Sequence, residues 1–77
     1  MKQLVEFMAR SLVDTPNDVH VSIHDGDHGG MVIELRVAEN DLGKVIGKKG
    51  RTAKAMRTII KAASSKNHNR AMLEILE

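Results

Sequence analysis

The chain has 77 residues, a formal net charge of +2 and no cysteine. This length suits one small domain, and the lack of cysteine excludes a disulfide framework and any thiol-based catalytic site. No apolar stretch reaches the length of a membrane span or of a signal-peptide core, so we expect a cytoplasmic protein.

The charges are distributed unevenly along the chain. Residues 42–73 contain nine Lys or Arg and no Asp or Glu, a charge of +9, whereas the remainder carries −7. A field of one sign over half of a small domain favours a polyanionic partner such as nucleic acid. Charge alone fits a solvated charged face equally well.

Residues 2–14 are predicted to form an amphipathic helix, in which Glu6 and Arg10 make an exposed pair one turn apart. The apolar stripe of this helix consists of Leu4, Val5, Met8 and Leu12. Phe7 falls away from the centre of the stripe. It therefore either packs under a neighbouring strand or stays exposed as a contact for a second subunit or partner. Pro16 follows the helix and starts a turn.

Residues 19–24 and 31–37 alternate apolar and polar side chains, as half-buried strands do. The turn-forming residues 25–30 between them predict a β-hairpin with a long connection. His and Asp residues in this hairpin raise the question of a metal site. However, His20 and His24 lie roughly 13 Å apart along an extended strand, and no cysteine is available, so we expect no metal.

A short helix is predicted to begin at Asn40 and Asp41, which can cap it, and to end at Gly47. The basic sequence Gly-Lys-Lys-Gly follows at residues 47–50 and opens onto the next helix. Its glycines allow positive φ or the close approach of another backbone. Free N–H groups and the helix dipole favour an anion at this point, with phosphate as the obvious candidate.

The strongest helical pattern covers residues 51–66. Its buried stripe is expected to consist of Ala53, Met56, Ile59, Ile60 and Ala63, and its exposed surface to carry Arg51, Lys54, Arg57 and Lys61. Residues 64–69 form a polar loop, and residues 70–76 alternate as a final strand with Leu73 and Ile75 facing inward.

The element order is helix, strand, strand, helix, helix, strand, which predicts one α+β domain. The second strand reaches the third through two helices, a connection long enough for parallel pairing. We therefore expect a three-stranded mixed sheet with three helices packed on one face.

Residues 45–51, Val-Ile-Gly-Lys-Lys-Gly-Arg, match the V-I-G-x-x-G signature of the KH domain, a module that binds RNA and single-stranded DNA. The motif lies between two predicted helices, as that signature requires. The element order resembles the type II KH arrangement, with an α-β extension (1–25) before a β-α-α-β core (30–77) in a single KH domain spanning 1–77. Residues 41–55 more narrowly resemble the small stand-alone bacterial KH proteins of the KhpA/YlqC type.

The resemblance implies that the Gly-Lys-Lys-Gly loop clamps the backbone of about four nucleotides. The implied RNA-binding residues are Lys44, Val45, Ile46, Gly47, Lys48, Lys49, Gly50, Arg51 and Lys54. An apolar groove for bases would be bordered by Leu42, Val45, Ile46, Thr52 and Ala53. Arg36 and residues 64–70 would form its far wall.

The resemblance further implies a non-enzymatic protein of broad specificity, an RNA chaperone or post-transcriptional regulator. It also implies self-association, a KH-containing partner of the Jag/KhpB type, or both. No window carries the P-loop sequence, and no catalytic triad or cofactor motif is evident. Because Tyr and Trp are absent, one copy should bind single-stranded RNA weakly, and a second domain would raise the avidity.

Two other functions remain open. The KH surface could serve as a protein–protein adaptor that dimerises, with RNA incidental. Alternatively, residues 51–66 could be the recognition helix of a helix-turn-helix DNA-binding protein.

Overall fold

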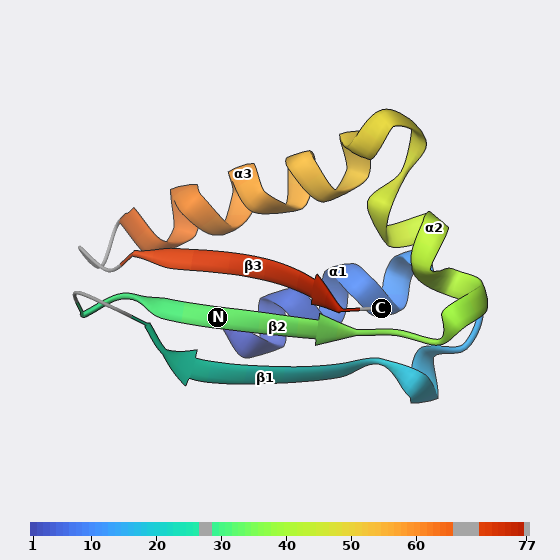
Figure 1. The fold of residues 1–77 in the computed structure, drawn as a ribbon, viewed down its shortest axis with the longest axis horizontal. Coiled ribbons are helices and arrows are strands. Elements are labelled where there is room, and N and C mark those ends of the chain that lie inside the picture. Colours follow the sequence, from blue (N-terminus) through green and yellow to red (C-terminus); the bar gives the residue numbers. More distant parts are fainter. Residues whose placement is uncertain (27–28, 66–69, 77) are drawn as a thin grey trace.

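The computed structural model describes residues 1–26, 29–65 and 70–76 (Figure 1). Its helices and strands are α1 (Lys2–Leu12), β1 (His20–Asp25), β2 (Met31–Arg36), α2 (Leu42–Ile46), α3 (Arg51–Ser65) and β3 (Ala71–Leu76). Short 3-10 turns occupy Pro16–Asp18, Glu39–Asp41 and Lys48–Gly50. The predicted α-β-β-α-α-β order is confirmed. Residues 27, 28 and 66–69 of the two predicted loops lie outside the described part.

The sheet has the strand order β1-β2-β3. β1 pairs antiparallel with β2, in a register that sets Val21 opposite Leu35. β2 pairs parallel with β3, in a register that sets Ile33 opposite Leu73. The predicted mixed sheet is thereby confirmed, and α2 and α3 form the connection that parallel pairing requires.

The buried side chains of the three strands share one face of the sheet: Val21, Ile33, Leu35 and Leu73. Side chains of α1, α2 and α3 complete the core against this face, with Val5, Val45 and Ile60 each almost fully buried. On the opposite face no described residue of the strands is buried, and Met72 is 61% exposed. The fold is therefore a two-layer α+β sandwich with one open sheet face. Within the described residues, no helix is long and apolar enough to cross a membrane.

α1 ends two residues earlier than its apolar pattern suggested. Val13 is already extended, at φ −99° and ψ 161°. Thr15 stands before Pro16, and a residue before proline is driven out of the helical region by a clash with the proline ring. The proline restricts Thr15 alone. The N–H groups of Asp14 and Thr15 bond to the carboxylate of Asp41 and not to carbonyls of α1, in keeping with the earlier end of the helix.

Two residues predicted to be buried are exposed. Leu12 is 38% exposed, because it is the last residue of α1 and lies beyond the buried pair Val5 and Ala9. Ile59 is 47% exposed, because it stands about 100° around the helix from its buried neighbour Ile60. The buried residues of α3 are instead Ala53, Met56, Ile60 and Ser64. Phe7, for which two positions were open, is 71% exposed.

Asp41 was expected to cap α2, and this expectation is wrong. Its side chain makes no capping hydrogen bond to that helix and is only 2% exposed. Its carboxylate oxygens accept hydrogen bonds from the backbone N–H of Asp14 at 3.2 Å and of Thr15 at 3.0 Å. The buried carboxylate therefore ties the end of α1 to the start of α2.

Lys44 completes this polar cluster. Its ammonium group hydrogen-bonds the carboxylate of Asp14 and lies 3.6 Å from that of Asp41. Burial raises the pKa of Asp41, but the two backbone hydrogen bonds and the charge of Lys44 together outweigh burial and hold the pKa below its ordinary value of 3.8. The hydrogen bond to Asp14 raises the pKa of Lys44 in turn. Both groups are thus charged at neutral pH.

The substitution Asp41→Asn should lower the melting temperature most at neutral pH. A carboxylate whose pKa is depressed by folding stabilises the protein above its unfolded pKa, and this stabilisation is lost as the pH falls through the lower folded pKa. The gap in melting temperature between wild type and variant, followed by circular dichroism, should therefore narrow from pH 7 to pH 3. Asp18→Asn, at an exposed position, is the control. A gap that stays constant across this range would contradict the assignment.

Candidate nucleic-acid interface

The loop at residues 47–50 forms one tight turn between α2 and α3. Gly47 has φ 78° and ψ 170°, and the N–H of Gly50 donates to the carbonyl of Gly47 at 3.0 Å. Lys49 and Gly50 also have positive φ, at 58° and 74°. Three of the four loop residues therefore have a positive φ, which turns the chain sharply. α3 starts directly after the loop, at Arg51.

Gly47 is required for two independent reasons. A side chain is strained at its positive φ, and a Cβ atom there would lie 2.6 Å from Cβ and 2.8 Å from the backbone nitrogen of Thr52. The positive φ of residue 50 also favours glycine there, but nothing lies within 4 Å of a Cβ atom built on Gly50. Gly47 therefore packs closely on α3, whereas Gly50 leaves open space in front of the loop.

The loop and the adjoining helix end are strongly basic. Lys48, Lys49, Arg51 and Lys54 are all exposed. The first turn of α3, which lies wholly in the described part of the chain, contains no acidic residue to compensate the helix dipole. Positive side chains and the positive end of α3 thus act at one point of the surface, an arrangement suited to phosphate.

Two residues expected at the interface have structural contacts. Val45 is fully buried in the core, so it supports the loop from below. Lys44 is engaged by the carboxylates of Asp14 and Asp41, as described above. Ile46 and Gly47 are half-buried beside the loop. The contacts of Val45 and Lys44 with RNA stay predictions, and the exposed cations of the loop and of the start of α3 are better placed to reach a phosphate.

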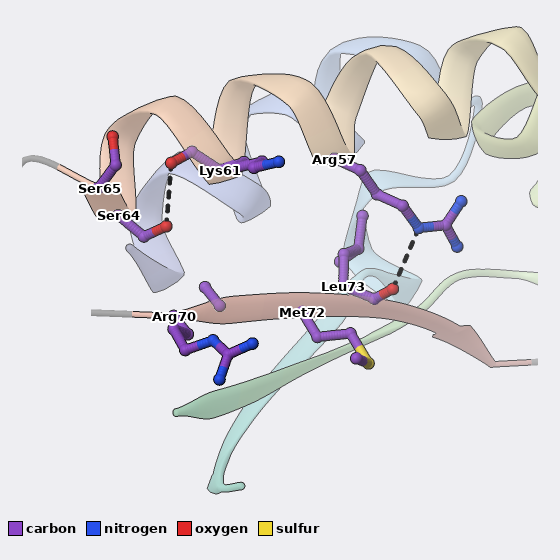
Figure 2. Close-up of a pocket in the computed structure, with 8 residues that line it drawn as sticks. Arg57, Lys61, Ser64, Ser65, Arg70, Met72 and Leu73 are labelled. Atoms are coloured by element: carbon purple, nitrogen blue, oxygen red, sulfur yellow. Dashed lines mark hydrogen bonds between the residues drawn. The ribbon is translucent and has the colours of Figure 1, made fainter. Parts of the chain in front are cut away.

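A hollow of about 380 Å³ lies between α3 and β3 (Figure 2). Arg57, Lys61, Ser64 and Ser65 line it from the helix, and Arg70, Ala71, Met72 and Leu73 line it from the strand side. Its volume falls in the range of about 300–1,000 Å³ that is typical of ligand sites. The sequence marked Arg57 and Lys61 only as exposed. Their spacing of four residues, which puts them on one helix face beside an edge strand, is the signal that could have assigned them to a groove.

The described residues that were expected to form the far wall of the groove line two separate hollows in the structure. Ser64, Ser65 and Arg70 line the hollow beside α3. Arg36 instead lines a separate hollow of about 610 Å³ with Val37, Glu39, Leu42 and Leu76. The reason is the alternation of β2, which directs Leu35 into the core and Arg36 to the open face. Residues 66–69 of the expected wall lie outside the described residues.

Of the hairpin residues that raised the question of a metal site, Asp27 and His28 lie outside the described residues. Nε2 of His24 lies 2.7 Å from a carboxylate oxygen of Glu34 across the two strands. Among the described residues, no group of three or more His, Cys, Asp or Glu could hold a metal ion.

Comparison with known proteins gives a consistent result over the whole chain. The model of the family described as "KhpA/KhpB, KH domain" matches residues 2–75. The curated relatives include proteins named RNA-binding protein KhpA from Clostridium acetobutylicum (54% identical over 76 residues) and Clostridium perfringens (51% over 76 residues). Another is the protein of that name from Halalkalibacterium halodurans, 53% identical over 77 residues. The alignments cover 99–100% of this chain and all of each relative.

The close packing of Gly47 predicts a specific cost of substitution. Gly47→Ala should lower the free energy of unfolding by at least about 1–2 kcal/mol, because the strain of a φ and ψ pair that is essentially restricted to glycine adds to the overlap with Thr52. Gly43→Ala is the matched control, since Gly43 lies within α2 and no atom is within 4 Å of an added Cβ. It should leave stability unchanged or raise it by up to about 1 kcal/mol. Urea unfolding measures both, and equal effects of the two substitutions would refute the packing argument.

Proposed function

This chain belongs to the KhpA/KhpB family of KH domains, and we propose that it is a single-domain protein that binds single-stranded RNA. The basic Gly47–Gly50 loop at the N-terminus of α3 is the observation that carries the proposal. The family match and the mixed sheet make the helix-turn-helix interpretation wrong.

In the proposed mode of binding, one part of the surface binds the phosphates and another part binds the bases. The ammonium groups of Lys48 and Lys49, together with the positive N-terminal end of α3, hold the phosphates of about four nucleotides. Arg51 and Lys54 add positive charge beside them. The bases turn toward the hollow between α3 and β3, where Arg57, Lys61 and Arg70 supply further charge. Because no Tyr or Trp is present, the grip is mainly electrostatic.

We also infer that this function is non-enzymatic and cytoplasmic, as an RNA chaperone or post-transcriptional regulator in a bacterium. Weak binding by one copy favours a second RNA-binding domain nearby, either in a homodimer or in a heteromer with a KH-containing protein of the Jag/KhpB type. The exposed apolar side chains Phe7, Ile59 and Met72 are candidate contacts for such a partner.

The second candidate function is a protein–protein adaptor, and the 71% exposure of Phe7 is the observation in its favour. A large aromatic side chain in contact with water is a typical anchor of protein interfaces. In this function the apolar contacts would matter and the lysines of the loop would not.

The double substitution Lys48→Asp with Lys49→Asp should abolish binding to a labelled single-stranded RNA in a fluorescence anisotropy titration. The change replaces two cations at the phosphate site by two anions. Lys2→Asp with Arg10→Asp makes the same change in net charge on α1, away from the loop, and should retain most of the affinity. Circular dichroism checks that both variants fold. Affinity of the loop variant equal to that of wild type would contradict the proposed clamp.

The affinity for single-stranded RNA should fall steeply with salt. Each phosphate neutralised on a single strand contributes a slope of about −0.7 to the dependence of log K on log salt concentration, so about four contacts predict a slope near −3. The same titration with duplex DNA should show weaker binding. A flat salt profile would favour the adaptor instead.

A further inference from the structure

Arg57 is held in a defined position on the wall of the hollow between α3 and β3. Its Nε donates a hydrogen bond to the carbonyl of Leu73 at 3.3 Å. This bond uses one N–H of a planar guanidinium group, and the two terminal nitrogens remain to form a fork. In Figure 2 the two terminal nitrogens lie on the side of the carbonyl that is nearer to the N-terminal half of α3. The loop adjoins this end of the helix. The side chain therefore presents two parallel donors rather than a mobile charge.

The same bond changes what the edge of β3 offers to a ligand. β3 is an edge strand, so backbone groups on its outer side are open to a single-stranded partner. The carbonyl of Leu73 faces α3 and is already satisfied by Arg57. An amino group on a base would thus have to share this acceptor with Arg57.

Three of the polar side chains that line the hollow, Arg57, Lys61 and Arg70, carry only N–H donors. Ser64 and Ser65 donate their hydroxyl hydrogens to helix carbonyls, so their oxygens can only accept from a ligand, and Ser64 is buried. No described residue that lines the hollow is acidic. Apolar atoms of Ala71 and Met72 give the flat face of a base a surface to lie on. The hollow therefore suits an aromatic ring whose edge carries acceptors.

We propose that Arg57 is a specificity-determining residue that selects, at one position of the bound strand, a base with two adjacent hydrogen-bond acceptors. Guanine offers O6 and N7, and cytosine offers O2 and N3. Adenine and uracil have a donor beside each acceptor on the corresponding edges. In a single strand all of these edges are open to the protein. This inference rests on the proposed RNA binding and adds a base preference to it.

The test compares RNA octamers that consist of uridine except for two central residues. Octamers with two guanosines or two cytidines should bind at least about fivefold more tightly than those with adenosines or uridines only, the lower end of what a good bidentate contact gives. Comparing the guanosine octamer with the cytidine octamer shows which base edge Arg57 binds, O6 and N7 of guanine or O2 and N3 of cytosine. In the guanosine octamer, 7-deazaguanosine removes N7 and should reduce the affinity to that of the adenosine octamer.

The variant Arg57→Lys keeps the charge and can still hydrogen-bond the carbonyl of Leu73, but it has no fork. It should lose the preference for guanosine or cytidine. Arg10→Lys makes the same chemical change on α1, outside the hollow, and should keep the preference. Circular dichroism verifies the fold of both variants.

Three outcomes overturn the inference. Equal binding of all four octamers by wild type would show that no base is selected, while leaving the RNA-binding function intact. A uniform loss of affinity in Arg57→Lys, with the preference kept, would make Arg57 a phosphate contact. If no octamer binds at all, the proposed function fails together with this inference.

Discussion

The structure of the interface depends on one steric constraint, the contact between Gly47 and Thr52. At φ 78° and with no room for a Cβ atom, Gly47 brings the chain out of α2 and against the first turn of α3. The positive φ angles of Lys49 and Gly50 follow within the same turn. Two lysines and the positive end of a helix are thereby concentrated at one point, so the chemistry of the loop follows from its backbone geometry.

Tertiary contacts outside the loop hold α2 in the position that the loop requires. Val45 anchors α2 in the core, and the buried carboxylate of Asp41 links its start to the end of α1. α2 has only five residues, too few for intrinsic helix stability, so these tertiary contacts must hold it. Lys44 belongs to the same support, because Asp14 and Asp41 neutralise much of its charge. The cations left for a ligand are therefore those of the loop itself, Lys48 and Lys49, and those at the start of α3, Arg51 and Lys54.

The element order, the mixed sheet and the position of the loop could be predicted because each depends on local pattern: alternation in the strands, helical spacing in α3, and glycine at Gly47. The contacts that could not be predicted depend on tertiary packing. A capping role for Asp41 was a reasonable local interpretation, but its carboxylate binds backbone groups 26 and 27 residues away. Likewise, the exposure of Ile59 and the fixed position of Arg57 depend on which face of α3 meets β3.

The central claim is that the loop and the hollow beside α3 form one continuous surface for single-stranded RNA. Backbone amide chemical shifts, measured by NMR during titration with a short single-stranded RNA, test this claim most directly. The largest shifts should fall on Gly47 to Lys54 and on β3 next to Arg57, with α1 unaffected. Shifts that cluster around Phe7 on α1, with the loop unchanged, would contradict it.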